Sequence, residues 1–374
     1  IAYVASGSTP DKTCFVENGV PYIKMYNLRN QKIDFAYHPQ YITEEVHNGK
    51  LQRSRTEVGD LIMNIVGPPL GKLAIIPTTL PQANFNQAAV LIRPYKFKEV
   101  LVSYLKVYLE EMSEINSIAT RGSAGQVNIS LTQSQNMRIP IPPLNEVRRI
   151  IEEVSKYDIL IDSLKQNITD IQNLIAYTKS KILDLAIHGK LVPQDPNDEP
   201  AIELLKRINP DFTPCDNGHY TQLPEGWAIC KMKQITSITN GKSQKNVETL
   251  HGIYPIYGSG GVIGRANQYL CIAGSTIIGR KGTINNPIFV EEHFWNVDTA
   301  FGLKANDAIL DKYLYYFCLS FDFSKLDKST AMPSLTKTSI GNVLIPIPPY
   351  KEQERIVAKI DMVLDTMNEI LRAV

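Results

Sequence analysis

The sequence predicts an α+β protein made of two tandem domains, each followed by a long helix. The main reason is a proline-rich segment that occurs twice, because residues 139–143 and residues 345–349 both read IPIPP. Each copy leads into a helical pattern, and Glu146, Arg149 and Ile150 of the first helix have identical counterparts in the second. A spacing of roughly 200 residues is far too long for a solenoid repeat, so it indicates a duplicated domain-plus-helix unit.

Composition supports two folded domains in a chain of this length. Hydrophobic residues make up 43% of the 374 residues, which is enough for a buried core in each half. No run of 18 apolar residues and no signal peptide is visible, so nothing is expected to enter a membrane. The five cysteines are scattered without a CxxC pair, which predicts reduced thiols in a cytoplasmic protein.

The first domain is expected over residues 1–144. Short β-type runs broken by glycine, proline and asparagine predict several short strands, and one longer pattern predicts a helix. The strands are expected at residues 20–25, 61–66, 73–76 and 88–92, and the helix at residues 102–115.

A long helix is predicted over residues 145–188, inside a central segment 145–200. Pro143 and the prolines before it force extended chain ahead of the helix, and Glu146 suits the positive end of the helix dipole. Apolar residues then alternate by three and four, the pattern of a coiled-coil seam, although two ordinary amphipathic helices are the alternative. At about 1.5 Å per residue the helix would be roughly 66 Å long. The expected seam residues are Ile150, Val154, Tyr157, Ile161, Leu164, Ile168, Ile171, Ile175 and Ile182.

The second domain is expected over residues 201–349, after a polar turn at residues 194–200. A short helix is predicted at residues 201–208, a linker at 210–220, strands at 253–256, 276–278 and 288–290, and a helix at 309–317. A second long helix is predicted over residues 350–374, and it carries the same coiled-coil pattern as the first. Its seam residues are Ile356, Ile360, Val363, Met367 and Ile370.

Shorter matches recur in the same order in both halves, and their shared order makes them persuasive. Gly59-Asp60-Leu61-Ile62 corresponds to Gly274-Ser275-Thr276-Ile277, Tyr104-Leu105 to Tyr313-Leu314, and Ser6-Gly7 to Asn240-Gly241. Ser130-Leu131-Thr132 corresponds to Ser334-Leu335-Thr336, with a two-residue shift. Basic residues exceed acidic ones in both globular parts and the reverse holds in both helical parts. This fits domains that touch phosphates and helices that touch protein.

No enzymatic motif survives inspection of the sequence. Residues 240–243 end like a phosphate-binding loop, but Thr236 stands where the first glycine is needed. Ile347 stands where an adenine-methyltransferase motif ending in Pro-Pro-Tyr needs aspartate or asparagine, and the six histidines show no metal-ligand spacing. The sequence therefore predicts no catalytic residue, no metal and no cofactor.

The chain resembles the specificity (S) subunit of type I restriction–modification enzymes over essentially its whole length. Both halves end in IPIPP and a Glu-x-x-Arg-Ile helix. Residues 189–201 (GKLVPQDPNDEPA) are similar to the family's end-of-spacer sequence, and residues 223–227 (LPEGW) to its usual domain entry. Residues 257–261 (YGSGG) are similar to a stretch common in its recognition domains.

The resemblance implies two target recognition domains, each reading one half of a split, asymmetric site in double-stranded DNA. It also implies that the two helices pair as an antiparallel coiled coil, set the distance between these domains and dock two methyltransferase (M) subunits. Restriction/translocase (R) subunits complete the restriction complex, and the S subunit itself holds no active site. Two alternatives are the recognition part of a fused restriction–modification polypeptide, and a coiled-coil scaffold without a DNA role.

Polar side chains in turns and glycine-rich loops are the candidates for DNA contact, because such loops approach a groove closely. For each one a solvated surface role is the alternative, and for Arg53 and Arg55 that role is favoured. The first-domain candidates are Lys24, Asn27, Arg29, Lys72, Arg121, Ser123, Gln126 and Asn128. The second-domain candidates are Tyr257, Ser259, Arg265, Arg280, Lys281, Lys328, Ser329, Thr330 and Ser334.

The two copies differ at their ends. The second domain has residues 223–234 before the position equivalent to Ile1, and the second helix is shorter than the first. A lead-in with an aromatic residue and a longer second helix are therefore expected in the full-length protein.

Overall fold

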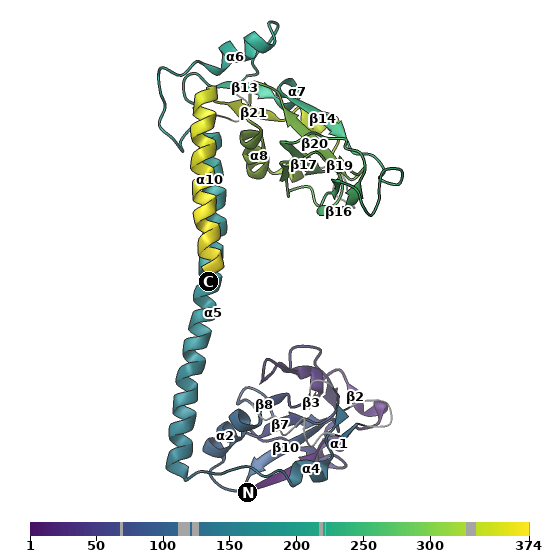
Figure 1. Cartoon of the computed structure of the whole chain (residues 1–374). Coiled ribbons are helices and arrows are strands. Elements are labelled where there is room, and N and C mark those ends of the chain that lie inside the picture. The colour runs from purple at the N-terminus through teal and green to yellow at the C-terminus, as the bar shows by residue number, and fades with distance from the viewer. Residues whose placement is uncertain are drawn as a thin grey trace. The chain divides into compact units, whose positions relative to one another are not determined.

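The computed structural model describes residues 1–67, 70–110, 120–121, 127–216, 220, 222–326 and 334–373, with the backbone alone at 120, 121 and 127. The chain forms two compact units, residues 1–164 and 165–374 (Figure 1). Each unit combines short strands with a few helices around its own buried core.

The main sheet of the first unit has four antiparallel strands in the order β1-β10-β7-β8. Its central strand β7 is buried at every residue, which explains the uninterrupted apolar run in the sequence. Helix α2 packs against β8 and β10. The bounds are β1 (Ala2–Ser6), β7 (Leu61–Asn64), β8 (Leu73–Ile75), β10 (Ala89–Pro94) and α2 (Lys98–Glu110).

A second, smaller sheet in this unit has the order β2-β6-β3-β9, and its β3–β9 pair is parallel. A hairpin of β4 and β5 follows, and its turn residues Asn30 and Gln31 both have positive φ, as a two-residue hairpin turn requires. The bounds are β2 (Phe15–Val16), β3 (Val20–Ile23), β4 (Leu28–Arg29), β5 (Lys32–Ile33), β6 (Tyr41–Ile42), β9 (Asn84–Phe85), β11 (Thr120–Arg121), β12 (Val127–Asn128), α1 (Glu44–Asn48) and α4 (Leu131–Gln135), with 3-10 turns η1 (Lys12–Cys14), η2 (Met25–Asn27) and η3 (Gln52–Ser54).

The second unit repeats this plan. Its main sheet has the order β14-β20-β17-β18, and its smaller sheet has the order β16-β15-β19 with a parallel β15–β19 pair. A two-stranded sheet joins β13 to β21, which contains the first three residues of the second IPIPP segment. The bounds are β13 (Ala228–Lys231), β14 (Thr236–Asn240), β15 (Tyr254–Gly258), β16 (Gly261–Ala266), β17 (Ser275–Gly279), β18 (Ile288–Val290), β19 (Trp295–Asn296), β20 (Ala300–Ala305), β21 (Leu344–Ile347), α6 (Ala201–Ile208), α7 (Met232–Ile235), α8 (Asp311–Ser320), α9 (Lys337–Gly341) and η4 (Phe323–Leu326).

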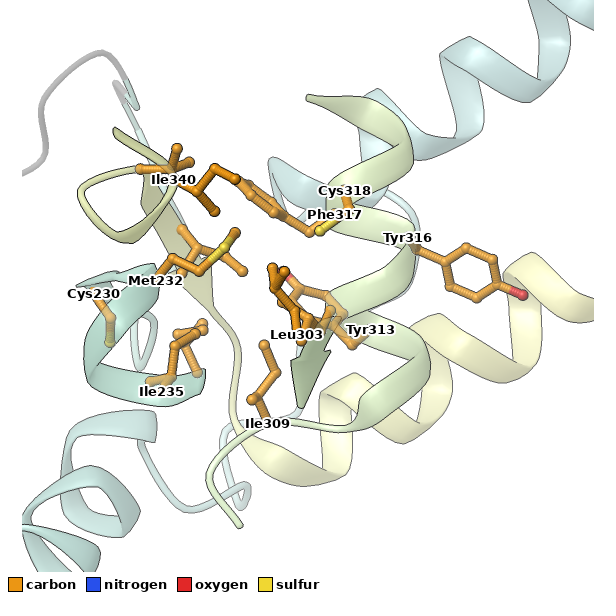
Figure 2. Close-up of a cluster of buried hydrophobic side chains, with 14 of the residues drawn as sticks. Cys230, Met232, Ile235, Leu303, Ile309, Tyr313, Tyr316, Phe317, Cys318 and Ile340 are labelled. Carbon is orange, nitrogen blue, oxygen red and sulfur yellow. The ribbon is translucent and has the colours of Figure 1, made fainter. Parts of the chain in front are cut away.

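The largest core cluster lies in the second unit, between α8 and the strands of the main sheet (Figure 2). Tyr313 and Phe317 of α8 are almost fully buried there. The thiols of Cys230 and Cys318 belong to the same cluster, and burial raises the pKa of Cys230 to about 12. Such thiols pack as small apolar groups, and all five cysteines are free.

Two long helices carry the predicted coiled-coil pattern. Helix α5 (Leu144–Ile187) has 44 residues, and helix α10 (Tyr350–Ala373) has 24. In the second unit α10 runs antiparallel to the last turns of α5, where Lys179 Nζ donates to Asn368 Oδ1 at 3.3 Å (Figure 1). The antiparallel pairing predicted for the two helices is therefore present in this unit.

The predicted seam is only partly buried. Among its residues Ile175, Ile356, Ile360 and Met367 are buried. Near the end of α5 the best-buried residue is Ala186, which the heptad pattern left out, because these turns pack on the core of the second unit. Ile150, Val154, Ile168, Ile171, Ile182 and Val363 are half-buried, whereas Tyr157, Ile161, Leu164 and Ile370 are exposed.

Several predicted bounds need correction. The predicted strand 20–25 ends at Ile23, because residues 25–27 form a 3-10 turn. The predicted helix 309–317 is α8 over 311–320, and the helix predicted at 102–115 begins at Lys98 and is described as far as Glu110. In the part of the chain that the structure describes, no helix could cross a membrane.

Candidate nucleic-acid interface

The two domains share one scaffold, and an equivalent tyrosine ties each domain to the proline-rich segment that follows it. In the first unit the Tyr104 hydroxyl donates to the carbonyl oxygen of Pro140 at 2.7 Å. In the second unit the Tyr313 hydroxyl donates to the carbonyl oxygen of Pro346 at 2.9 Å. The predicted equivalence of these tyrosines and of the two IPIPP segments is confirmed by a contact present in both units.

A second repeated contact fixes the loop that precedes α4 in the first domain and α9 in the second. The Ile129 amide donates to the Ile65 carbonyl at 2.9 Å. The Leu335 amide donates to the Arg280 carbonyl at 2.8 Å. Adjacent residues form equivalent isolated bridges, Val66 with Asn128 and Lys281 with Ser334.

These equivalent backbone contacts correct one predicted match between the two halves. The Ser130 hydroxyl caps α4 by accepting from the Gln133 amide at 3.1 Å. The Thr336 hydroxyl caps α9 by accepting from the Ser339 amide at 3.0 Å. Ser130 therefore corresponds to Thr336, and the two-residue shift inferred from matching Ser-Leu-Thr is wrong, because a helix cap requires a hydroxyl and not the same residue.

Three second-domain candidates lie together at this loop. Lys281 and Ser334 form the bridge, and Arg280 directly precedes Lys281 in the chain. The Arg280 guanidinium is half-buried, with its Cζ 5.9 Å from the centre of the Phe301 ring. Lys281 is exposed, so among the described residues of this loop it is a cation that can reach a ligand.

The candidates after the first strand of the first domain have different roles. Asn27 is buried, and its amide donates to the carbonyls of Asp34 and Tyr37 and accepts from the Lys24 amide. It shapes the loop from inside, so the prediction that its side chain reaches a groove does not fit its position. Arg29 is exposed and lies over the Tyr37 ring, with its Cζ 4.0 Å from the ring centre. The Lys24 side chain is half-buried.

The other first-domain candidates are only partly described. Lys72 and Asn128 are half-buried, and the Lys72 amide donates to Asn64 Oδ1 at 2.5 Å. Arg121 lies in β11, where the structure describes its backbone alone. The remaining candidates of both domains lie outside the described residues: Ser123, Gln126, Lys328, Ser329 and Thr330.

The β15–β16 hairpin carries the other candidates of the second domain. Tyr257 is half-buried against Phe294, and desolvation, more than the nearby Glu292, raises the pKa of its hydroxyl. Arg265 is exposed, and Ser259 sits at the turn. Sequence reasoning missed the aliphatic residues of β16, an edge strand, where Val262 is 57% and Ile263 is 56% exposed. Large aliphatic side chains on an exposed edge indicate a partner.

A second missed feature is a groove of about 620 Å³ in the first domain, here called the arginine groove. It brings residues of η3 together with β1, β10 and the segments next to them. Two of its arginines are the ones expected to be merely solvated. The groove is lined by Arg53, Arg55, Arg93, Tyr3, Tyr95, Gln52, Gln82, Glu57 and Pro94.

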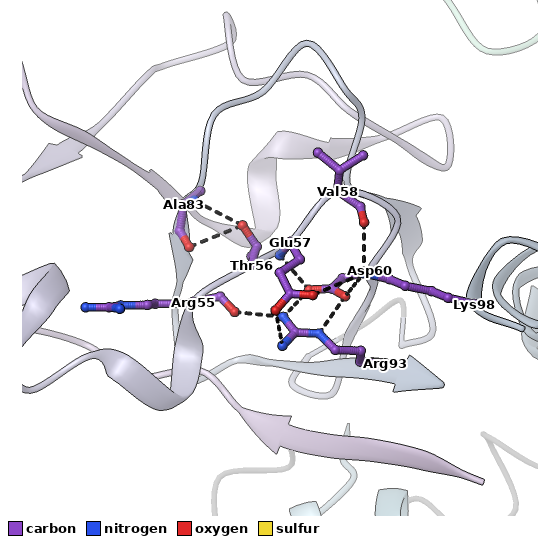
Figure 3. Close-up of polar contacts among 8 residues, drawn as sticks. All are labelled: Arg55, Thr56, Glu57, Val58, Asp60, Ala83, Arg93 and Lys98. Atoms are coloured by element: carbon purple, nitrogen blue, oxygen red, sulfur yellow. Dashed lines mark hydrogen bonds and ion pairs between the residues drawn. The ribbon is translucent and has the colours of Figure 1, made fainter. Parts of the chain in front are cut away.

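A buried carboxylate anchors one side of this groove (Figure 3). Asp60 is fully buried and accepts from both Arg93 and Lys98, with the Arg93 Nη2 to Oδ2 distance at 2.6 Å. Glu57 completes the cluster, with its Oε1 2.8 Å from Arg93 Nη1. The hydrogen bond that Arg93 donates to Asp60, ahead of other causes, raises the pKa of Arg93. Charge on this side is therefore balanced by two cations and two carboxylates.

The first turns of α10 are held by side chains from the segment between α5 and β13. Glu352 is buried and accepts from the Trp227 indole at 3.0 Å and from Gln194 at 2.8 Å. Arg355 pairs with Asp198, with 2.6 Å between Nη2 and Oδ2. Desolvation raises the pKa of the Glu352 carboxyl, which the two hydrogen bonds only partly offset. The corresponding residues of the first copy, Glu146 and Arg149, are exposed.

In the part of the chain that the structure describes, no group of three or more His, Cys, Asp or Glu side chains could hold a metal ion. The features that the two domains present are cationic loops, a cationic groove and an apolar hairpin. These are groups that contact phosphates and base edges.

Comparison with known proteins agrees with this architecture. The sequence matches the family described as "Type I restriction modification DNA specificity domain" over residues 1–173 and 224–374. It is 26% identical to the type I restriction enzyme EcoAI specificity subunit of Escherichia coli, over 67% of this chain and 57% of that protein. It is 21% identical to the EcoKI specificity subunit of Escherichia coli K12, over 91% of this chain and 75% of that protein.

Solved structures share the fold. The HsdS subunit from Thermoanaerobacter tengcongensis superposes with a TM-score of 0.60 at 17% identity, covering all of this chain and 88% of that one. A chain from a structure of complex assembly and conformational transition in the type I R-M system gives 0.64 at 19% identity, covering all of this chain and 92% of that one. With its sequence matched in both halves, this chain belongs to the family of type I restriction modification DNA specificity domains.

Proposed function

We propose that this chain is the DNA-recognition subunit of a type I restriction–modification complex. Each domain reads one half of a bipartite, asymmetric site in double-stranded DNA, in the cytoplasm. The observation that carries this proposal is one scaffold used twice with different side chains at equivalent loop positions. Val66 bridges Asn128 in one domain, whereas Lys281 bridges Ser334 in the other. Different loop chemistry on a shared scaffold suits two different short base sequences.

The chemistry of the complex belongs to its partners, so this subunit is not itself an enzyme. Two methyltransferase (M) subunits dock on the long helices, one per repeat, and restriction (R) subunits complete the complex. Exposed apolar side chains on α5 support this part, because a soluble helix rarely carries so many without a partner. They include Tyr157, Ile159, Leu160 and Leu164, each between 57% and 69% exposed.

The decisive test of recognition is a domain exchange. We expect that coexpression with the M partner and genome-wide mapping of methylated DNA give one split, non-palindromic motif. Replacing residues 1–144 with another family member's first domain should change one half of that motif and leave the other half intact. A continuous motif, or a change in both halves, would refute the two-domain reading. Failure to bind DNA at all would favour a coiled-coil scaffold instead.

The docking surface has its own test. Replacing Ile161 and Ile168 together with aspartate puts two charges into the apolar stripe, so assembly should fail before either recognition domain is affected. Size-exclusion chromatography with M subunits measures assembly, and circular dichroism checks folding. A double variant that still purifies with two M subunits would exclude the stripe as the organising surface.

A further inference from the structure

We propose that the arginine groove of the first domain holds the sugar-phosphate backbone of the bound DNA, as a clamp that does not read bases. The inference rests on the proposed function and assigns one of its contacts. The groove has the size and the charge for a segment of one strand, and no sequence motif marks it.

The charges in the groove do not cancel. Arg93 and Lys98 are matched by Asp60 and Glu57, as Figure 3 shows. Among the residues that the structure describes, Arg53 and Arg55 pair with no carboxylate. Two positive charges therefore remain for an anionic ligand, in a recess that lowers the screening of each charge by solvent.

The two unmatched arginines are held in place before any ligand arrives. Arg53 Nε donates to Ser8 Oγ at 3.2 Å, and the Ser8 carbonyl in turn accepts from the Tyr22 hydroxyl at 2.8 Å. Arg55 Nε donates to the His47 carbonyl at 3.0 Å, and its Nη2 donates to Asn48 Oδ1 at 2.7 Å. Preformed geometry lowers the entropy lost on binding.

These anchors are separate, which favours a chain of phosphates over one small anion. Arg53 is anchored at the end of β1, Arg55 at the end of α1, and Arg93 at Asp60 beside β7. In Figure 3 the Arg55 side chain extends away from the Arg93 guanidinium, so the cations line the groove instead of meeting at one point. A single phosphate needs converging donors, whereas successive phosphates need spaced ones.

The way the N–H groups are used favours phosphate over base edges. Reading a guanine takes two parallel N–H groups of one arginine. Arg55 Nε and Nη2 already donate to acceptors within the protein. Arg93 already contacts Asp60, Glu57 and the Arg55 carbonyl. Arg55 and Arg93 therefore act on a ligand mainly by charge. Arg53 contacts Ser8 through Nε, so the mutational test below decides whether its Nη groups hold phosphate or read a base. Tyr95, 71% exposed, and Tyr3, 39% exposed, add hydroxyl donors of the kind that contact DNA phosphates.

The clamp is a property of the first domain. The strand pairings of β10 and β20 make Lys304 the counterpart of Arg93. Lys304 forms an ion pair with Asp311 and donates to the Ala273 carbonyl, so its charge is already paired inside the domain. The inference therefore predicts different salt dependence for the contacts that the two domains make.

The test measures DNA affinity of the full chain with its M subunits between 50 and 200 mM salt, on a duplex carrying the mapped motif and on one without it. Arg53→Ala should weaken binding to both duplexes roughly tenfold at the low-salt end. It should also reduce the slope of log affinity against log salt by about 0.9, the value for one phosphate contact. Arg53→Lys keeps the charge and should keep most of the slope.

Arg138→Ala is the matched control, because Arg138 is an exposed arginine of the first domain that lies outside the groove and off the long helices. It should leave affinity and slope unchanged. The inference fails if Arg53→Ala has no effect, if it relaxes one base position of the motif, or if Arg138→Ala lowers the slope equally. A wild-type complex that does not prefer the mapped motif would instead refute the proposed function, so the two failures are distinguishable.

Discussion

The two recognition domains have the same skeleton and different surfaces. Their main sheets have the same strand order, and both tie the following proline-rich segment with a tyrosine hydroxyl. The first domain is hollowed by a groove lined with arginines, whereas the second presents an edge hairpin with exposed aliphatic residues. The contacts that the two domains share are within the scaffold, whereas their exposed side chains differ.

The same divergence occurs inside the domains. Gly59 and Gly274 both have positive φ just before the central strand, so the turn is shared. The next residue is the fully buried Asp60 in the first domain and Ser275 in the second. The strand cation persists as Arg93 or Lys304, but its acid comes from a different element, Asp60 before β7 in the first domain and Asp311 of α8 in the second. Both domains thus keep an ion pair at this strand position, but the acidic partner comes from a different element in each domain.

The largest expected effect separates these two ion pairs. Asp60→Asn leaves Arg93 and Lys98 without their fully buried acid, and we expect a loss of about 3 kcal/mol in the unfolding free energy of the first unit. Asp311→Asn removes a partly exposed acid and should cost the second unit about 0.5–1 kcal/mol. Denaturant unfolding followed by hydrogen exchange, which resolves the units, measures both. Equal losses would mean that burial does not distinguish the pairs.

The tyrosine tethers should also differ in strength. Tyr313→Phe leaves the buried Pro346 carbonyl without its donor, and we expect a loss of about 1–3 kcal/mol. Tyr104→Phe frees the Pro140 carbonyl in an exposed position where water replaces the hydroxyl, so about 0.5–1 kcal/mol should be lost. Thermal unfolding of the single variants tests the ranking. A costlier change in the first domain would contradict it.

Unlike the arginine groove, the exposed aliphatic residues of the β15–β16 hairpin are predicted to contact bases. Aliphatic side chains can contact the thymine methyl group in the major groove, which also admits a two-stranded ribbon. We expect Val262→Ser with Ile263→Ser to weaken binding to the mapped motif by about 1 kcal/mol without changing the salt slope. Duplexes with deoxyuridine in place of thymine in the second half-site should weaken wild-type binding similarly. Wild-type binding that ignores the missing methyl groups would exclude this contact.

The smallest effect concerns the acids that begin the two long helices. Because the Glu352 pKa is raised, the folded chain holds that proton more tightly than the unfolded chain does. The unfolding free energy should therefore fall as pH rises from the ordinary value of 4.5 through the raised value, by less than about 1 kcal/mol. Glu352→Gln should flatten this region of the profile. Glu146→Gln, at the exposed equivalent position, is the matched variant for comparison.

Much of the scaffold could be predicted from the sequence because local rules and the duplication agree. Proline fixed the start of α5, and three-four spacing fixed its extent to within one residue. Matching identical residues failed at Ser130, where a threonine hydroxyl performs the same capping in the other copy. The DNA-contact residues stay predictions, although Asn27 shows how a polar loop residue can serve the loop itself.

The arginine groove could not be found in this way, because its parts are distant in the chain. Arg53 and Arg93 are brought together only when η3 packs beside β1 and β10. Nothing in the local pattern separates Arg53 from other exposed arginines, and its orientation depends on Ser8, far earlier in the sequence. Signals of this kind belong to tertiary structure.

The hydrogen bond from each domain's tyrosine to the following proline-rich segment affects how domains can be exchanged between genes. Its acceptor is a main-chain carbonyl, which every residue at that position supplies, and its donor comes from inside the domain. A gene fragment that encodes a whole domain therefore also encodes the tyrosine that donates this hydrogen bond. The protein that receives the domain has to supply only a proline-rich segment whose backbone places the carbonyl within reach. Recombination between the two DNA segments that encode IPIPP would join a foreign domain to the chain without further change to this contact. New pairs of domains can therefore arise in a single event.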